Sequence, residues 1–509
     1  MASENIVNTR QGLKHGIINN IINMILPFIS RTIILYTLGT KYLGLGSLFS
    51  SILSLLSLSE LGLGSAIAYM LYAPVALNDV TEVNKLLNFY RKCYRYVGII
   101  IFIVGIIIVP FLQNIIHDGV PSDVNIYVLY SMYLFQTVIS YFLFSYKTVL
   151  LTANQRYDIF VRIQSIVKIL TSCLQIILIL LFKNYYLFVA VLPVMAIVEN
   201  ILDNYFVSKM FPQYKFEGII EKEESAKLFK NVIGAFSVKI GDTIYLSADQ
   251  IVISAFLGLS VLGIYGNYYY IITAIIAVFA VLHNTIRPIV GKYMVLHSIE
   301  DNFKLFKTIN YGYELVTIWC TSCLLSLYQP FMKIWVGQDN MLDLYMVILL
   351  AIYFFTGRLY GMLGIYNDAA GIWWHGKYVS LGSGLGNLAL NILLVKFWGL
   401  PGILISSIVS SIFIAFPGYT YVVFKYYFKS REYLKQFSFE MMKVSLCCIA
   451  TCTMTYIVCQ LMCFDGILGF IFLAITCGLL SALSIVALNF KSMEFSKMVE
   501  LLRRYISKK

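Results

Sequence analysis

Charged residues are scarce in this sequence: they make up 13% of its 509 residues, whereas 59% are hydrophobic. So little charge leaves too little polar surface to cover a water-soluble fold of this length. The loops between the hydrophobic stretches are short, and none is large enough to form a catalytic domain outside a membrane. The composition therefore predicts a polytopic membrane protein.

Motifs for nucleotide, redox and catalytic chemistry are also missing. The glycines of residues 44–46 and 62–64 are not followed by Lys-Ser/Thr, so they do not form a phosphate loop. Residues 319–323 have the outline of a thioredoxin-like motif, but they lie inside an apolar stretch that partners cannot reach. His283 has no evident catalytic partner in the sequence. We expect a protein that is not an enzyme and that holds no cofactor or metal.

Long hydrophobic runs dominate what is present. Fourteen apolar stretches of about 20 residues, each long enough to cross a membrane as a helix, occupy residues 16–38, 43–69, 97–116, 126–150, 163–182, 185–206, 232–257, 261–286, 308–328, 344–364, 378–397, 402–424, 441–459 and 467–490. The first stretch is too long, too Asn-rich and too poor in small residues to be a removable signal peptide. We predict an all-α fold of about 14 transmembrane helices, with the first helix retained in the mature protein.

The first twelve stretches read as one six-span unit written twice. Four Leu and Gly residues of the first copy recur about 219 positions later: Leu38, Gly39, Leu43 and Gly44 match Leu257, Gly258, Leu262 and Gly263. The same interval lays the amphipathic residues Leu86, Leu87, Tyr90 and Tyr94 over Leu305, Phe306, Ile309 and Tyr313. Because six is an even number of crossings, both copies face the same way, as in transporters with a site between two lobes.

These spans predict four parts of the chain. We expect an N-terminal six-helix lobe in residues 1–207, a cytoplasmic linker in 208–230, a C-terminal six-helix lobe in 231–430, and two extra helices with a basic cytoplasmic tail in 431–509. The amphipathic segments after the second and eighth spans are typical of interfacial helices, so we expect them to lie along the inner leaflet.

The basic residues predict the orientation, because Lys and Arg are held on the cytoplasmic side of membranes. With the N-terminus inside, only Lys41, Lys183, Lys333 and Lys396 fall outside. Both termini are then cytoplasmic. The formal charge of +12 is explained by topology and lipid contact, and it requires no nucleic-acid partner.

Ionisable residues inside the spans indicate function, because each costs about 2.5–3.5 kcal/mol at the bilayer centre. Arg31 shares a helical face with Asn20 in the first span, and Lys239, Asp242 and Asp249 share a face in the seventh. The first and second helices of each copy are predicted to line a shared polar cavity. Its candidate residues are Asn20, Asn23, Arg31, Glu60, Lys239, Asp242, Asp249, Asn267, Tyr270 and Asn284.

A purely structural reading of these charges is also open. Lys239 with Asp242 is within ion-pair reach, and Arg31 could pair with Asp249 only to hold the lobes together. Glu60 could reach the inner headgroups. Arg358, late in the tenth span, is interpreted as an anchor at the inner interface.

Two regions carry a resemblance to a known family. They are residues 43–49 with 58–64 and Ala66, and residues 249–254 followed by 262–265, Asn267 and Tyr268. With these runs the chain resembles bacterial oligosaccharide flippases, whose superfamily includes multidrug and toxin extrusion transporters and lipid II flippases. The resemblance implies flipping of a polyprenyl-diphosphate-linked oligosaccharide across the bacterial plasma membrane for surface polysaccharide assembly. The last two spans resemble the added pair of lipid II flippases, which help form a groove for the lipid tail.

The candidate residues fit an anionic glycolipid. Arg31 and Lys239 would attract the diphosphate. The sugar would contact polar side chains, namely Asn20, Asn23, Asn267, Tyr268, Tyr269, Tyr270 and Asn284. Glu60, Asp242 and Asp249 could bind Na⁺ or a proton to drive the return of the empty cavity, and the sequence leaves open whether such coupling exists.

Two rival transport functions stay open. A cation/drug antiporter of the same superfamily would use Asp242 and Asp249, although Arg31 and Lys239 argue against it. A lipid II flippase is the other alternative. In each case we expect a monomer whose partners are membrane lipids and the transported molecule.

Overall fold

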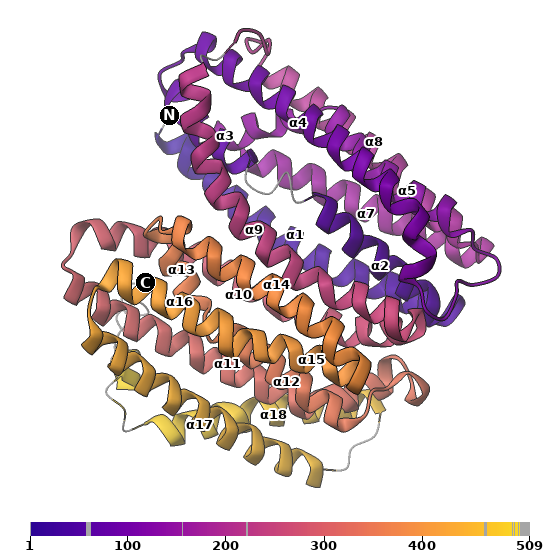
Figure 1. Cartoon of the computed structure of the whole chain (residues 1–509), viewed down its shortest axis with the longest axis vertical. Coiled ribbons are helices and arrows are strands. Elements are labelled where there is room, and N and C mark those ends of the chain that lie inside the picture. Colours follow the sequence, from indigo (N-terminus) through magenta and orange to yellow (C-terminus); the bar gives the residue numbers. More distant parts are fainter. Residues whose placement is uncertain are drawn as a thin grey trace. The chain divides into compact units, whose positions relative to one another are not determined.

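The computed structural model describes residues 2–57, 63–154, 156–219, 222–462 and 466–490, with a few residues up to Met498. All the regular elements among these residues are helices, as the all-α prediction requires. Contacts within the chain divide it into two units, Met1–Gly266 and Asn267–Lys509 (Figure 1).

The first unit is a bundle of long helices. In chain order it contains α1 (Ala2–Thr37), α2 (Thr40–Leu56), α3 (Leu63–Ala76), α4 (Val80–Ile108), η2 (Val109–Ile115), α5 (Ile126–Phe142), η3 (Ser145–Thr148), α6 (Val149–Ala153), α7 (Tyr157–Phe182), α8 (Tyr185–Met210), α9 (Lys222–Leu257) and the start of α10 (Leu259–Leu296). Helix α1 packs along α7, α5 packs on α8, and α2 packs on α9. The first helix of the second sequence repeat therefore packs inside this unit.

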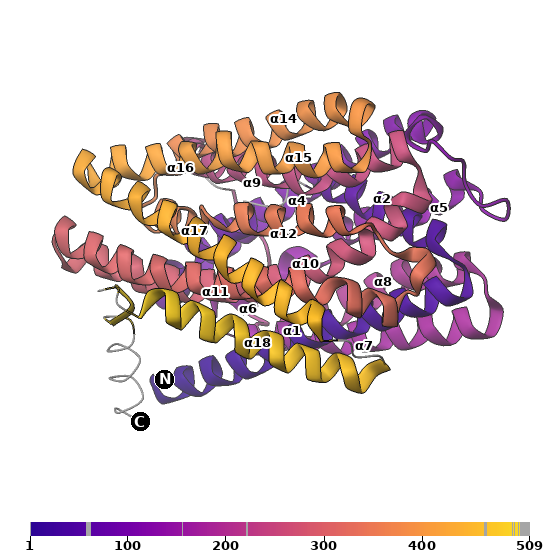
Figure 2. The same ribbon diagram turned by 90° about the horizontal axis from the view of Figure 1, so that it is seen from below.

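The second unit continues from α10. It contains α11 (Ile299–Trp335), η4 (Gln338–Asn340), α12 (Leu344–Arg358), α13 (Gly361–Ala369), α14 (Trp373–Trp398), α15 (Leu400–Ser410), η5 (Ser411–Ala415), α16 (Phe416–Val422), η6 (Val423–Phe428), α17 (Arg431–Leu461) and α18 (Gly466–Asn489). The two extra helices, α17 and α18, pack side by side on α11 (Figure 2). The contact includes a hydrogen bond between the Ser481 and Ser322 hydroxyls at 3.0 Å.

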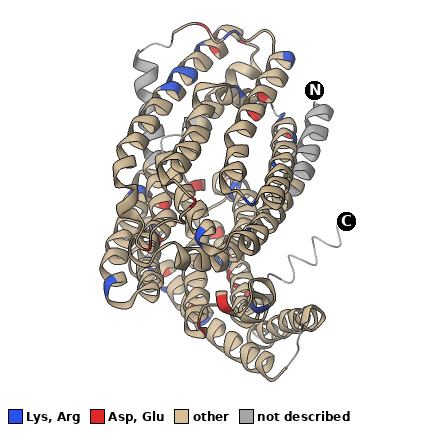
Figure 3. Ribbon diagram, turned by 90° about the vertical axis from the view of Figure 1, so that its right-hand side faces the viewer, with Lys and Arg blue, Asp and Glu red and all other residues tan. Residues whose placement is uncertain are grey.

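The positions of Lys, Arg, Asp and Glu are sparse along the ribbon (Figure 3). Within the described residues, 12 helices are long and apolar enough to span a membrane, or 13 if one bent pair counts as a span. The predicted count of fourteen is not confirmed. The remaining predicted stretch, 43–69, falls on α2 and α3, and residues 58–62 between them lie outside the described part of the chain.

The bent pair is the predicted fourth span. Its two segments, Ile126–Phe142 and Ser145–Ala153, meet at 53°. The Asn200 side chain of α8 accepts hydrogen bonds from the Phe144 backbone N–H at 3.1 Å and from the Ser145 hydroxyl at 2.9 Å. A break inside a membrane frees backbone groups that need partners, and Asn200 supplies one.

The amphipathic segments differ from the prediction, because they are not separate interfacial helices. Each is the first part of a long helix that runs without a break into the next span: Val80–Ile115 and Ile299–Trp335. Their apolar residues, such as Leu87, Tyr94 and Phe306, are buried in protein. An apolar helical face looks the same in a sequence whether it meets lipid or a protein groove, which explains the error.

The segment that follows α8 is held against α4. The Asn88 side chain donates to the Gly218 carbonyl at 2.7 Å, and Arg91 donates to the Phe216 carbonyl at 3.2 Å. Phe216 adopts a positive φ of 57° and its ring packs edge-on against Tyr146. The described start of the predicted linker is thus a docked segment.

Candidate substrate site

The two sequence repeats meet at a close backbone contact within the first unit. A Cβ atom added at Gly44 would overlap the carbonyl oxygen of Leu259, and one added at Gly263 would overlap the carbonyl oxygen of Thr40. The two contacts are related by the same interval as the Leu-Gly repeats. Glycine at both positions lets the starts of α2 and α10 touch through their backbones.

The loop after η2 reinforces this contact at the corner between α9 and α10. The Ser254 hydroxyl donates to the Ile115 carbonyl at 2.8 Å, and the His117 N–H donates to the Ser254 carbonyl at 3.1 Å. Asp118 accepts a hydrogen bond from the Leu259 N–H at 2.8 Å and so caps the start of α10. We call residues 115–118 with this corner the clasp. In the predicted orientation the clasp lies at the outer end of these helices.

Arg31 lies close to the contact between the repeats. Its Nη2 atom is 3.0 Å from the position that a Cβ of Gly266 would take, and the Ser47 hydroxyl is 3.3 Å from the same point. Gly266 therefore leaves room for the guanidinium beside α2 and α10. Arg31 also acts electrostatically on the buried Tyr185 hydroxyl, which donates to the Tyr42 carbonyl at 3.1 Å.

The depth of Arg31 follows from helix geometry. It is six residues before the end of α1, which corresponds to about 9 Å from the C-terminal end of the helix at a rise of 1.5 Å per residue. A cation at that depth lies within the hydrocarbon thickness of a bilayer. The residue as a whole is half-buried in protein, and its Nε atom is fully buried.

The charged residues of α9 differ in how far protein covers them and in their position along the helix. Asp249 is almost fully buried, Asp242 is half-buried, and Lys239 is exposed. Gln250 is the repeat equivalent of Arg31, and Lys239 precedes it by about 17 Å along the helix axis. In this register the two cations lie at different depths along α1 and α9.

The other predicted residues are distributed over both units. Asn20 and Asn23 are exposed on α1, and it is their neighbour Asn19 that accepts a hydrogen bond from the Ser165 hydroxyl of α7, at 3.0 Å. In the second unit, Asn267 is fully buried, Tyr270 is half-buried and Asn284 is exposed. Glu60 lies outside the described residues.

Tyr268 and Tyr269 are buried in the second unit. The Tyr268 hydroxyl donates to the Gln329 side chain and accepts from the Leu342 N–H, both at 3.0 Å. With both roles of its hydroxyl used in this way, Tyr268 belongs to the core of the unit. The predicted sugar contact would require the Tyr268 hydroxyl to exchange these partners, and a one-face pattern does not distinguish a core tyrosine from a cavity tyrosine.

Several ionisable residues inside the helices escaped the sequence reading. Lys168 of α7 and Glu199 of α8 interact electrostatically, and Glu199 acts on the buried Asp203 one turn later. In the second unit, Glu314 is fully buried. A systematic search for charged residues within each apolar stretch would have found all four.

His283 has a partner that the sequence did not reveal. Its Nε2 atom lies 3.2 Å from Asp368 of α13, and the Trp373 indole N–H donates to the other oxygen of Asp368 at 3.0 Å. This pair joins α10 to α13. No group of three or more residues of the metal-binding types forms a metal site within the described part of the chain.

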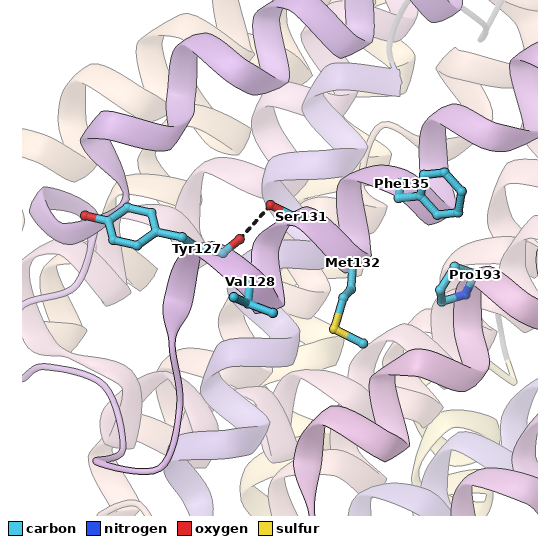
Figure 4. A pocket seen from close by; sticks show the side chains of 6 residues that line it. All are labelled: Tyr127, Val128, Ser131, Met132, Phe135 and Pro193. Atoms are coloured by element: carbon cyan, nitrogen blue, oxygen red, sulfur yellow. Dashed lines mark hydrogen bonds between the residues drawn. The ribbon is translucent and has the colours of Figure 1, made fainter.

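A shallow depression of about 440 Å³ lies between α5 and α8 (Figure 4). It is lined by Tyr127, Val128, Ser131, Met132, Phe135 and Pro193. The one polar group of Ser131 is used internally, because its hydroxyl donates to the Tyr127 carbonyl at 2.7 Å. An open apolar surface without charge suits an acyl chain and cannot hold a diphosphate.

The chain was compared with known proteins. No family model and no curated protein sequence matches it. Among solved structures, the lipid II flippase MurJ in an inward closed conformation aligns at 14% identity with a TM-score of 0.63, covering 94% of this chain and 98% of the flippase.

Two multidrug transporters of the MATE type are also similar. An inward-facing member of the MOP superfamily aligns at 12% identity and a TM-score of 0.57, covering 80% of this chain and 94% of its own. The Vibrio cholerae transporter VcmN aligns at 12% identity and a TM-score of 0.54, covering 84% and 99%. At these identities the likeness establishes the fold: the chain has the fold of MOP superfamily transporters.

Proposed function

We propose that this protein is a flippase that moves a polyprenyl-diphosphate-linked oligosaccharide from the cytoplasmic to the outer leaflet of a bacterial plasma membrane by alternating access. The observation that carries the proposal is the position of Arg31. It places a permanent cation within a membrane-spanning helix, where α1 of the first repeat approaches α2 and the first turns of α10. A guanidinium that can bind bidentately suits a phosphate group.

The depths of the two cations favour sequential binding. Lys239 lies near the inner end of the α9 span, Ser237–Leu257, and its side chain is exposed. The diphosphate would meet Lys239 first and Arg31 deeper in the pathway. Asn20 and Asn23, exposed on the inner half of α1, would contact the sugar on the way.

The clasp supports an alternating mechanism. The backbone contact of Gly44 with Leu259 and the Asp118 cap close the outer ends of α2, α9 and α10 against one another. Outward release would require these contacts to open. Moving negative charge outward is favoured by an inside-negative potential, by about 2.3 kcal/mol per charge per 100 mV.

The acids of α9 would serve the return step. Asp249 is almost fully buried at the depth of Arg31, and Asp242 is half-buried two turns closer to the inner end. With the diphosphate gone, a Na⁺ or a proton bound at Asp242 or Asp249 would reduce the cost of a charged cavity. The other residues proposed for the substrate pathway are Asn267, Tyr270 and Asn284 of α10, and Glu60.

An antiporter of organic cations is the second candidate, and the near-complete burial of Asp249 favours it. A buried carboxylate is what a cationic substrate requires. Binding experiments separate the two functions, because they assign the substrate to residues of opposite charge.

The direct test is binding of a polyprenyl-diphosphate oligosaccharide to the purified protein in lipid nanodiscs. Arg31→Ala should weaken equilibrium binding about 10- to 100-fold, since a charge-assisted hydrogen bond contributes about 1.5–3 kcal/mol. Lys239→Ala should mainly slow association, because its cation meets the diphosphate first. Arg31→Lys should retain part of the affinity. Lys396→Ala, which removes an exposed cation at the end of α14, is the matched control and should bind normally.

The antiporter hypothesis predicts the opposite binding pattern. A cationic dye would bind, its binding would be lost in Asp249→Asn or Asp242→Asn, and no glycolipid would bind at all. That combination would replace the flippase by an antiporter.

A further inference from the structure

The second unit contains a carboxylate in an unusual position. Glu314 of α11 is 0% exposed, and neither of its carboxylate oxygens has a hydrogen-bond partner within the described part of the chain. A carboxylate oxygen buried without a donor carries a large desolvation penalty. Native proteins rarely tolerate such a group without a use for it.

One cation stands next to it. Arg358, the last residue of α12, is the charged neighbour that acts on Glu314. The guanidinium lies beside the Tyr313 hydroxyl, and its buried Nε has no partner among the described residues. Glu314 and Arg358 are therefore close enough to attract each other but are not joined by a hydrogen bond.

Among the described residues, Arg358 is the charged group that acts on Glu314, and the nearest charged cluster, Lys307 with Glu440 and Glu494, lies two turns earlier along α11. On α17, the Cys448 thiol is close enough to Glu314 to interact with it electrostatically. Tyr360 lies near Tyr313 at the break between α12 and α13. From α18, Cys477 contacts Cys323, further along α11. The thiols and phenols are neutral near pH 7, so Arg358 is the charged group that faces Glu314 in the described structure.

Two neighbours of the pair bear on how it is held. Asn310, one turn before Glu314, has an amide oxygen without a partner among the described residues, although its nitrogen contacts the Met441 sulfur at 3.6 Å. Gly361, at the start of α13, has no side chain and so admits the Tyr313 hydroxyl. Arg358 thus sits at the end of one helix segment, between a phenol and a carboxylate.

From this geometry we propose that Glu314 is a proton-binding site of the second unit, which exchanges its proton as Arg358 moves between the Tyr313 hydroxyl and the Glu314 carboxylate. With Arg358 at Tyr313, Glu314 carries a proton taken from water and is a neutral acid. With Arg358 at Glu314, the O–H bond breaks, the proton returns to water, and an ion pair replaces it. A fixed structural ion pair would instead have its hydrogen bonds in place.

The site differs from the cavity acids of the proposed function. Glu314 belongs to α11, which packs on α12, α17 and α18. The inference holds for any substrate, because it concerns a proton and one arginine. Its failure would leave the glycolipid assignment of Arg31 and Lys239 intact.

The test is infrared difference spectroscopy of the purified full-length protein between about pH 5 and pH 9, at constant Na⁺ concentration. Wild type should show a carbonyl stretch of a buried, protonated carboxylic acid whose intensity changes with pH. Glu314→Gln should lose the Glu314 component of that band, which leaves only what other buried acids such as Asp203 and Asp249 contribute. The matched control is Glu300→Gln, which removes an exposed carboxylate of the same helix that pairs with Lys304, and it should keep the band.

A second variant keeps the test decisive if Glu314→Gln does not fold. Arg358→Gln should alter the pH dependence of the same band, because it removes the alternating partner. The proposal is overturned if the wild-type band is absent, if it does not change with pH, or if it survives unchanged in Glu314→Gln. Identical titrations of wild type and Arg358→Gln would overturn the role of Arg358.

Discussion

Gly44 touches the carbonyl oxygen of Leu259 so closely that no other residue fits at position 44 without displacing backbone. A side chain at position 263 would likewise overlap the carbonyl oxygen of Thr40. The two contacts join the first repeat to the beginning of the second, and the clasp at Asp118 lies beside them. In the proposed transport cycle these contacts would close one end of the pathway, and a small change should weaken them.

Alanine at either glycine should separate the starts of α2 and α10. We expect Gly44→Ala and Gly263→Ala to lower stability by about 1–3 kcal/mol each, the usual cost of overpacking. Thermal unfolding in detergent measures this effect. Gly291→Ala is the control, because an added Cβ on that part of α10 meets nothing within 4 Å. Equal unfolding temperatures for all three variants would contradict the close contact.

Asp118→Ala should loosen the outer end. The change removes the cap of α10 and the 3.7 Å ion pair with Lys41, a loss of about 1–2 kcal/mol. A cysteine placed at the buried Leu262, in a cysteine-free background, should then react several-fold faster with a membrane-impermeant maleimide added outside. Asp339→Ala, at an exposed position in η4, should leave the rate unchanged. An unchanged rate in Asp118→Ala would exclude the clasp as a closing element.

Asn88→Ala should release the docked segment after α8. Without the bond from Asn88 to the Gly218 carbonyl, trypsin should cleave at Lys215 more readily than in wild type. Lys92→Gln, an exposed change on the same helix, should not increase cleavage. Cleavage in inside-out but not right-side-out vesicles would support a cytoplasmic linker, and the reverse would contradict the predicted orientation.

The two extra helices have a polar attachment to α11 that can be tested. The Ser481 hydroxyl of α18 lies 3.0 Å from the Ser322 hydroxyl and 3.4 Å from that of Thr455 in α17. Ser481→Leu should force the three helices apart, whereas Ser481→Ala should be nearly neutral, since such bonds average about 0.6 kcal/mol in membranes. If α17 and α18 guide the lipid tail, Ser481→Leu should weaken binding of a long-chain glycolipid and spare a short-chain analogue. Equal effects on both would argue against a tail groove.

Much of the fold could be predicted, because membrane helices must be long, apolar and internally hydrogen-bonded. The Leu-Gly repeats identified the positions where Gly44 and Gly263 bring backbones together. The continuity of α4 and α11 was not predictable, because amphipathicity does not reveal what covers the apolar face. The attachment of the last two helices through Ser481 was not predictable either, because it depends on single hydroxyls.

The site was predicted less completely than the fold. A search for charge in the first two helices of each repeat found Arg31 and Asp249, and it passed over Glu314 and Asp203 because they lie in other helices. The difference in depth between Lys239 and Arg31 became clear only after the repeat interval was used to match Gln250 of α9 with Arg31 of α1. Pairing through loops, as between Asp118 and the Leu259 N–H, has no periodic pattern in sequence.

The central claim is that Arg31 recognises a diphosphate during translocation, and transport itself tests it most directly. The measurement is the rate at which a fluorescent polyprenyl-diphosphate oligosaccharide reaches the far leaflet of proteoliposomes, for wild type, Arg31→Lys and Arg31→Ala. Wild type should flip the glycolipid rapidly, Arg31→Lys should flip it partially, and Arg31→Ala should flip it at least about tenfold more slowly. Equal rates for wild type and Arg31→Ala, or no flipping by wild type alongside uptake of a cationic dye, would contradict it.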